Sequence, residues 1–217
     1  MSALGIAAFV AMLLLAYLVG SIPFGLVVGK VFYHVDVRYH GSGNVGATNV
    51  FRVLGKKAGV VVLVCDMLKG YVPAFVAAYF FRETNPWLAI FIAGAPVVGH
   101  MYSVFLKGSG GKGVATGAGV VLALVPLAFG ILIAVLVLFI LITRYVSLAS
   151  LVAAFLVPVL VFAFGNPLPY EIAAVLVTVV IFWAHRGNIR RLIAGSENRV
   201  KLPWSRDNSA LAGGGVS

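Results

Sequence analysis

The chain has 217 residues, of which 62% are hydrophobic and only 10% are charged, whereas a soluble domain carries about 25% charged residues. This composition excludes an ordinary soluble protein. The 16 Lys and Arg residues outnumber the 6 Asp and Glu residues. Most of the basic residues lie in short loops between apolar runs, which predicts that these loops are cytoplasmic and lie beside anionic membrane lipids. The same distribution predicts no nucleic-acid partner. Apolar runs recur along residues 1–199, which predicts one all-α polytopic integral membrane domain, and residues 200–217 have the composition of a disordered tail.

Seven apolar segments are expected to be transmembrane helices, some of them short. They cover residues 3–28, 58–81, 86–106, 113–124, 126–142, 146–164 and 170–184. The boundary at Pro126 divides what would otherwise be one long span, and this division keeps Arg144 and all later basic clusters on the same side as the earlier ones. The positive-inside bias then places the N-terminus outside, and it places the C-terminus, Ser147 and the glycine-rich loops in the cytoplasm.

The first polar loop, GSGNVGATNVFR at residues 41–52, suits an anion with several oxygens. Its three glycines allow the backbone to turn so that several N–H groups point into one concavity. The same stretch offers short donor side chains and a planar cation, namely Ser42, Asn44, Thr48, Asn49 and Arg52. A flexible glycine loop that only joins two membrane helices is the alternative, and the polar residues favour a phosphate site.

The second apolar segment contains an acidic and a basic residue, Asp66 and Lys69. Their i,i+3 spacing places them on one helical face, where each can neutralise the other. We interpret them as a structural pair that supports the site, in preference to direct catalysis. The single cysteine, Cys65, lies in the same apolar run and is expected to be an inert buried side chain. His100, near the inner end of the third segment, is interpreted as a packing residue.

The second polar loop, KGSGGKGVAT at residues 107–116, precedes an apolar helix that should begin near Gly113. A helix N-terminus offers unpaired N–H groups and a partial positive charge, which favour a bound anion. Lys112 adds a full charge at the same place, so Gly111, Lys112 and Gly113 are predicted to bind a phosphorylated substrate. The spacing does not match a Walker loop. A basic loop that only determines topology is the alternative.

The last polar region begins with HRGNIRR at residues 185–191. His185, Asn188 and Arg191 would share one face if the preceding helix continues. A basic interfacial helix that binds anionic headgroups is the better interpretation for its arginines, Arg186, Arg190 and Arg191. His185 and Asn188 remain candidates for a role in the site.

The three polar regions together favour chemistry between two phosphorylated substrates at a membrane surface. The sequence contains no HExxH motif, paired carboxylates or Cys/His cluster, so we expect neither a metal nor a cofactor. A transporter of phosphorylated metabolites is an alternative, although it should show repeat symmetry and charge near the membrane midplane. A purely structural membrane subunit is a third possibility, but it would leave the glycine-rich loops unexplained.

Five ordered motifs resemble a known family. GSGNVGATNVFRVLG, DMLKG, GHMYSVFLKGSGGKGVAT, RYVSLAS and HRGNIRRLIAGSEN are similar to segments of the bacterial acyl-phosphate:glycerol-3-phosphate acyltransferases, the PlsY family, over residues 15–199. The resemblance implies an enzyme of the bacterial inner membrane that transfers an acyl chain from acyl-phosphate to the 1-hydroxyl of sn-glycerol 3-phosphate. The products would be lysophosphatidic acid and phosphate, and the activated donor makes an acyl-enzyme unnecessary.

The same resemblance implies roles for individual residues. The phosphate of acyl-phosphate would lie in a hole formed by Ser42, Asn44, Gly46 and Thr48. Glycerol 3-phosphate would be held by Arg52 together with the four residues expected to be catalytic, Lys112, Ser147, His185 and Asn188. Glu197 would brace the last loop.

Overall fold

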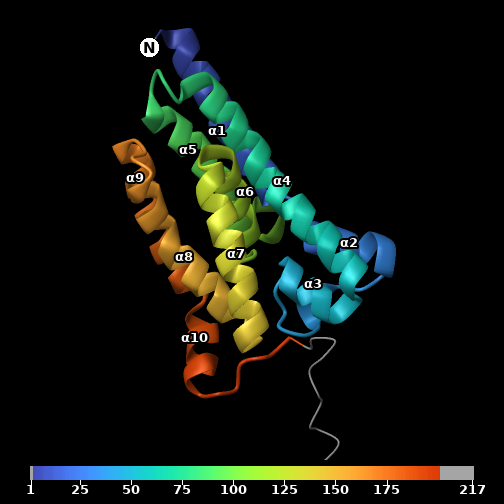
Figure 1. Cartoon of the computed structure of the whole chain (residues 1–217). Coiled ribbons are helices and arrows are strands. Elements are labelled where there is room, and N and C mark those ends of the chain that lie inside the picture. Colours follow the sequence, from blue (N-terminus) through green and yellow to red (C-terminus); the bar gives the residue numbers. More distant parts are fainter. Residues whose placement is uncertain (1, 201–217) are drawn as a thin grey trace, which may run out of the picture.

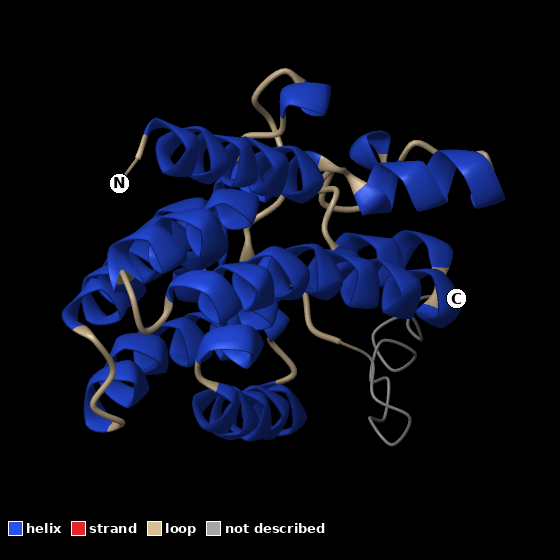
Figure 2. Cartoon of the chain, turned by 90° about the horizontal axis from the view of Figure 1, so that it is seen from above, coloured by secondary structure: helices blue, strands red, loops and turns tan. Residues whose placement is uncertain are grey.

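The structure is a computed structural model that describes residues 2–200. Within these residues all regular secondary structure is helical, and loops join the helices (Figures 1 and 2). The helices are α1 (Ala3–Ser21), α2 (Phe24–Tyr33), α3 (Ala47–Leu54), α4 (Lys56–Phe81), α5 (Pro86–Met101), α6 (Val114–Leu124), α7 (Pro126–Thr143), α8 (Val146–Ala163), α9 (Leu168–Ala184) and α10 (Arg186–Ile193). Two short 3-10 turns follow α2 and α5, at Val37–Tyr39 and Val104–Leu106. The predicted disordered tail, apart from Val200, lies outside the described residues.

The helices confirm an all-α integral membrane protein, but they do not confirm seven spans. Five described helical segments are long and apolar enough to cross a membrane: α1, α4, α5 with its 3-10 extension, α7 and α8. A sixth span results if α9 and α10, which are bent by 60° at their junction, are counted together. The predicted segment at 113–124 forms α6, which has 11 residues and is too short for this count.

The first predicted span, 3–28, is divided in the structure. α1 ends at Ser21 and α2 begins at Phe24, with Ile22 in an extended conformation just before Pro23. Proline has no N–H to donate and disfavours helical geometry in the preceding residue, so the helix breaks at this point. The Ile22 carbonyl instead accepts a hydrogen bond from Lys69 Nζ at 2.8 Å.

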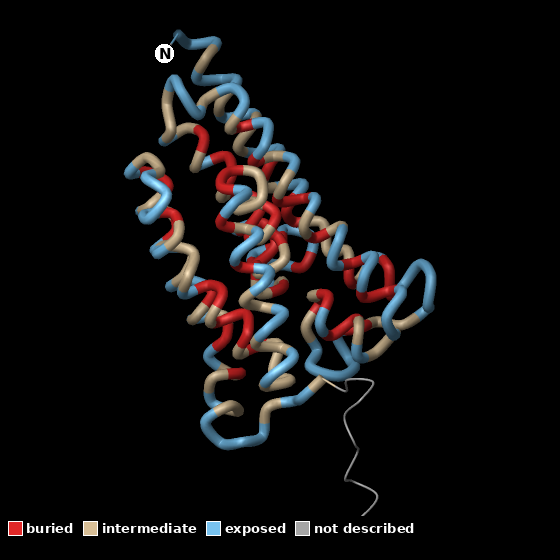
Figure 3. Tube along the Cα trace, in the orientation of Figure 1, coloured by how far each residue is buried: buried red, intermediate tan, exposed pale blue. Residues whose placement is uncertain are grey.

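Small residues bring the central helices into close contact. A Cβ atom at Gly70 of α4 would overlap the backbone of Thr116 in α6, and one at Gly99 of α5 would overlap the backbone of Tyr17 in α1. Such contacts are typical of helix pairs in membranes, where packing replaces the hydrophobic driving force between helices. Buried residues therefore concentrate where α1, α4, α5 and α6 meet, whereas exposed residues, many of them large and apolar, line the outer faces (Figure 3).

The polar loops gather at one end of the bundle. α3 and α10 lie at this end, opposite the N-terminus (Figure 1). The junction of α7 and α8 lies there too, because the Val200 N–H donates to the Arg144 carbonyl at 2.8 Å. The division of residues 113–142 into two helices thus places Arg144 and Ser147 beside the other polar regions, as the charge pattern predicted.

Candidate functional site

A polar cleft of about 490 Å³ opens at this end of the bundle. It is formed by three segments that are far apart in the sequence: the first glycine loop, the second glycine loop, and the α9–α10 junction with the segment that follows α10. The lining residues are Gly41, Ser42, Asn44, Lys112, Ala184, Arg186, Gly187, Asn188, Arg190, Arg191 and Asn198. The structure therefore brings Ser42, Asn44, Lys112 and Asn188, four of the predicted site residues, together in one cleft.

Asn49, in the first turn of α3, holds the first loop in shape. Its side chain is buried, and its Oδ1 accepts a hydrogen bond from the Ser42 N–H at 2.8 Å. Its Nδ2 donates to the carbonyls of Val37 at 3.0 Å and His40 at 3.1 Å. All of these partners are backbone groups, so Asn49 organises the loop and is not the ligand donor that the sequence suggested.

The remaining residues of the first loop differ in their access to the cleft. Asn44 Oδ1 accepts a hydrogen bond from the Gly46 N–H at 2.8 Å, which fixes the turn that leads into α3. Gly46 caps α3, so this turn sets the direction of the helix. Thr48 and Arg52 lie on the exposed surface of α3 and are not among the lining residues.

Of the two lysines in the second loop, Lys112 lines the cleft, and its position is set by the backbone on either side. The Gly111 N–H donates to the His100 carbonyl at 3.0 Å, and Gly113 begins α6 with a φ of +80°, in the left-handed region that glycine tolerates. Gly111 and Gly113 are buried and do not line the cleft. Their arrangement directs the Lys112 ammonium to Asn188 Oδ1, to which it donates a hydrogen bond.

The surroundings of Lys112 lower the pKa of its ammonium group. Burial lowers its pKa from 10.5 to about 8; Glu197 opposes this shift, while Arg191 and Arg52 add to it. Lys112 is therefore mostly protonated at neutral pH but close to its titration range. An incoming phosphate would favour the charged form and raise this pKa.

Glu197 connects the elements behind the cleft. Its Oε1 accepts hydrogen bonds from Ser147 Oγ at 2.8 Å and Asn188 Nδ2 at 2.6 Å, and its Oε2 accepts one from Arg191 Nε at 2.7 Å. Burial alone would raise the pKa of Glu197, but these three hydrogen bonds outweigh it and hold the pKa below its usual value. Ser147 is buried, bonded to Glu197 and absent from the cleft lining.

His185 lies at the bend between α9 and α10, between the lining residues Ala184 and Arg186. Its Nδ1 is 2.8 Å from the Ile181 carbonyl; a carbonyl only accepts, so Nδ1 carries the hydrogen and Nε2 is left as an acceptor. Burial, reinforced by the Lys112 charge, lowers the pKa of His185 to about 4. The imidazole is therefore neutral at physiological pH.

The bend corrects the expected alignment of this region. The preceding helix does not continue straight, so His185 does not share a single helical face with Asn188 and Arg191. His185 is the capping residue between α9 and α10, whereas Asn188 and Arg191 project from α10 to the same carboxylate, Glu197.

The structure places the three arginines of the last polar region at the cleft. Arg186, Arg190 and Arg191 line it together with Gly187 and Asn198, two residues that the sequence pattern did not indicate, and binding of anionic headgroups by these arginines stays a prediction. The Arg186 guanidinium lies over the Trp183 ring, 4.2 Å from its centroid, which is a cation–π arrangement. An interfacial basic helix and an arginine-lined cleft have the same sequence pattern, so the sequence alone does not distinguish them.

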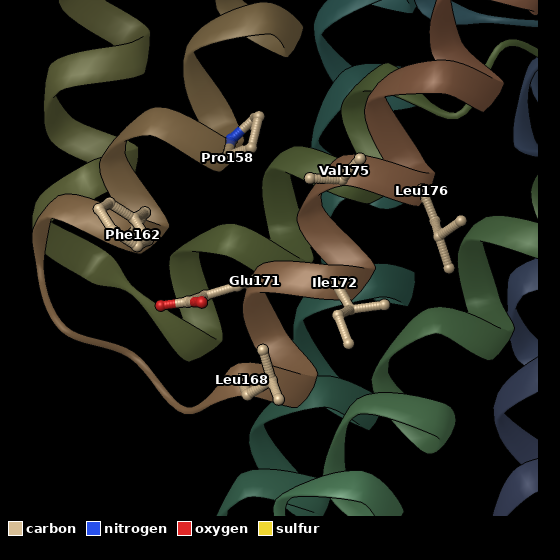
Figure 4. A pocket seen from close by; sticks show the side chains of 7 residues that line it. All are labelled: Pro158, Phe162, Leu168, Glu171, Ile172, Val175 and Leu176. Carbon is tan, nitrogen blue, oxygen red and sulfur yellow. The ribbon is translucent and has the colours of Figure 1, made fainter.

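A second pocket, of about 350 Å³, lies between α8 and α9 (Figure 4). It is lined by Pro158, Phe162, Leu168, Ile172, Val175 and Leu176, and Glu171 is its one charged side chain. These residues belong to the last turns of α8 and the first turns of α9, away from α10. The pocket contains none of the predicted site residues.

The chain is similar to known proteins over most of its length. Residues 10–195 match the family model described as glycerol-3-phosphate acyltransferase. A glycerol-3-phosphate acyltransferase of Geobacillus kaustophilus is 51% identical over 194 residues, which cover 89% of this chain and 97% of the relative. A glycerol-3-phosphate acyltransferase of Fusobacterium nucleatum is 44% identical over 196 residues, which cover 90% of this chain and all 100% of the relative.

Two solved structures have the same fold. One is a crystal structure of PlsY (YgiH), an integral membrane glycerol 3-phosphate acyltransferase, in its glycerol 3-phosphate form. It superposes on this chain with a TM-score of 0.86 at 44% identity, and the match covers 89% of this chain and 96% of that one. Its lysophosphatidic acid form gives 0.84 at 43% identity, with the same coverage. The resemblance inferred from the five motifs is thus confirmed, and the chain belongs to the glycerol-3-phosphate acyltransferase family of integral membrane proteins typified by PlsY.

Proposed function

We propose that the protein transfers a fatty acyl chain from acyl-phosphate to the 1-hydroxyl of sn-glycerol 3-phosphate and releases lysophosphatidic acid and inorganic phosphate. The observation that carries the proposal is the cleft in which Ser42 and Asn44 of the first loop face the same space as Lys112 and Asn188. A reaction between two phosphorylated substrates needs two anion sites that share one cleft. The relatives named for glycerol 3-phosphate, and the neighbouring structures with substrate and product, support the acceptor and the product.

Acyl-phosphate is the donor that suits this cleft. It is a mixed anhydride with phosphate as its leaving group, so its only polar part is one small anion. A coenzyme A thioester would need contacts for an adenine nucleotide, and the described loops between helices are short and form no such module. Ser42 and Asn44 of the first glycine loop would bind the donor phosphate in the cleft, while Gly46 fixes the turn beside them and Thr48 lies outside the lining.

Glycerol 3-phosphate would be held from the opposite wall. Lys112 supplies a partly buried charge for its phosphate, and Asn188, already bonded to Lys112, is placed beside it. Arg52 contributes charge from the surface of α3. Ser147 acts indirectly in this scheme, because its hydroxyl donates to Glu197, which in turn holds Asn188.

The chemical step is direct attack on the acyl carbonyl. The substrate 1-hydroxyl oxygen forms a bond to the acyl carbon, the bond from that carbon to the phosphate oxygen breaks, and the hydroxyl proton passes to the departing phosphate. Neutral His185 offers Nε2 to accept a hydrogen bond from the attacking hydroxyl and so orients it, but a group with a pKa of about 4 is too weak a base to retain the proton. Lys112 and the loop N–H groups stabilise the charge that develops.

The site would face the cytoplasm of a bacterial inner membrane, with the N-terminus outside and the C-terminus inside. The support is the collection of basic residues at the end of the bundle that holds α3 and α10, opposite the N-terminus (Figure 1). Residues 1–199 would form one domain. A transporter is less well supported, because the charges within α4 are paired with each other instead of lining a passage.

Donor preference tests the proposal. The purified protein in lipid nanodiscs should convert labelled glycerol 3-phosphate to lysophosphatidic acid with palmitoyl-phosphate, and it should do so far more slowly with palmitoyl-coenzyme A. Lys112→Ala should reduce the first rate strongly. Equal rates with the two donors, or turnover with coenzyme A alone, would contradict the proposed donor.

A further inference from the structure

A buried polar cluster lies beside the second glycine loop and forms no part of the cleft wall. It consists of Asp66 and Lys69 of α4 and His100 of α5, and we call it the Asp66 cluster. Lys69 Nζ lies 2.7 Å from Asp66 Oδ1, and His100 Nδ1 lies 3.6 Å from the same oxygen. All three side chains are at most 6% exposed. Ionisable groups inside a membrane bundle are costly to bury, so their arrangement indicates a purpose beyond packing.

One arm of the Asp66 cluster reaches the first glycine loop. Lys69 Nζ donates to the Ile22 carbonyl at the break between α1 and α2, and the same carbonyl accepts the Phe24 N–H at 3.1 Å. α2 starts two residues later, and a Cβ atom at its Gly25 would overlap the carbonyl of Val45 in the first loop. The ammonium of Lys69 therefore holds the start of the helix on which the first loop rests.

The other arm reaches the second glycine loop. The His100 carbonyl accepts the Gly111 N–H at 3.0 Å. A Cβ atom at Gly111 would overlap the imidazole ring at Nε2, and one at Gly110 would overlap the His100 carbonyl. The loop therefore lies directly on His100, and Lys112 is the next residue along the chain. A change in the position of His100 would move the point from which the Lys112 side chain extends.

We propose that the Asp66 cluster sets the separation of the two glycine loops, and that His100 is the positioning residue for Lys112. This inference rests on the proposed function, in which the first loop binds the donor phosphate and Lys112 binds glycerol 3-phosphate. Lys69 is tied to the base of the first loop, His100 is tied to the second, and Asp66 joins the two. Buried ion pairs add little net stability, but they can specify one arrangement. Because the hydroxyl must approach the carbonyl closely, an error of about 1 Å can reduce the rate about 100-fold.

The distance between the loops can be measured without any reaction. Spin labels at Tyr39→Cys and Ser109→Cys, both exposed positions beside or within the loops, would be introduced with Cys65→Ser. Pulsed electron paramagnetic resonance should give one narrow distance distribution, and His100→Leu should broaden or shift it. Ser150→Ala is the matched control, because it removes another buried polar group, a hydroxyl that within residues 2–200 donates to the Val146 carbonyl of its own helix, α8. A distribution unchanged by His100→Leu would overturn the proposal.

Steady-state kinetics of the unlabelled protein provide a second test of the proposal. His100→Leu should reduce kcat with acyl-phosphate by about 10- to 100-fold, and His100→Asn, which keeps an N–H near the position of Nδ1, should restore part of the loss. If His100→Leu does not fold, the double variant Asp66→Leu/Lys69→Met removes both charges together and leaves neither unpaired. It should fold and still show the lower kcat, and unchanged kcat and KM would overturn the proposal. If the wild type does not use acyl-phosphate at all, the proposed donor fails while the distance measurement still tests the positioning role.

Discussion

Removal of the Lys112 charge is the perturbation whose effect follows most directly from the structure. Lys112 is the lysine of the second loop that lines the cleft, it is partly buried, and its ammonium already donates to Asn188. A close charge pair that is shielded from water is worth about 2–5 kcal/mol when one partner is removed. At about 1.4 kcal/mol per tenfold change, Lys112→Ala should lower kcat/KM for glycerol 3-phosphate between about 30-fold and several thousand-fold.

The assay is steady-state formation of labelled lysophosphatidic acid by the purified variant in nanodiscs. The matched control is Lys107→Asn in the same loop, which removes an exposed charge outside the cleft. Lys107 has a φ of +52°, a conformation that asparagine tolerates, so this control should fold normally and keep nearly full activity. Equal kinetics for the wild type and a folded Lys112→Ala variant would refute the argument and reduce Lys112 to a topology signal.

Three further predictions concern pH, the arginines and topology. Because the pKa of Lys112 is lowered to about 8 and its charged form is required, kcat/KM should fall as pH rises through about 8, and Lys112→Arg should move this limb to higher pH in a pH–rate profile. Arg190 lines the cleft but is exposed, so Arg190→Ala should raise KM for glycerol 3-phosphate several-fold with little change in kcat. His185→Ala, in contrast, should mainly lower kcat. An unchanged KM for Arg190→Ala would indicate that Arg190 contacts lipid headgroups instead of the substrate. Single cysteines at Ser2 and Ser196 should react with membrane-impermeant reagents from opposite sides, Ser2 from outside, and reaction of both from one side would contradict the proposed orientation.

The sequence predicted the helices well where long apolar runs decide them. α4, α7 and α8 begin and end within a few residues of the predicted bounds, because charged or glycine-rich stretches interrupt the apolar pattern there. The first span was wrong in one respect: the predicted segment 3–28 runs through Pro23, which separates α1 from α2. The bend after α9 had no comparable signal, because no proline marks His185.

The site was harder to predict because its contacts connect distant parts of the chain. Lys112 and Asn188 are 76 residues apart, and Ser147 and Glu197 are 50 residues apart. The resemblance implied that Lys112, Ser147 and Asn188 would all hold glycerol 3-phosphate, yet in the structure Ser147 donates to Glu197, and of these three only Lys112 and Asn188 line the cleft. Asn49 illustrates the same limit, since an amide that holds a loop and an amide that binds a ligand have the same sequence pattern.

The central claim is that the acyl group passes directly from acyl-phosphate to glycerol 3-phosphate, and acid-quench labelling tests it most directly. The protein carrying Cys65→Ala, which removes the single cysteine, would be mixed with acyl-labelled palmitoyl-phosphate, quenched and denatured before analysis for covalent label. The account predicts nearly full activity for this variant and no label on the protein, with or without glycerol 3-phosphate. Stoichiometric label that survives denaturation, and that glycerol 3-phosphate removes at the rate of turnover, would contradict direct transfer.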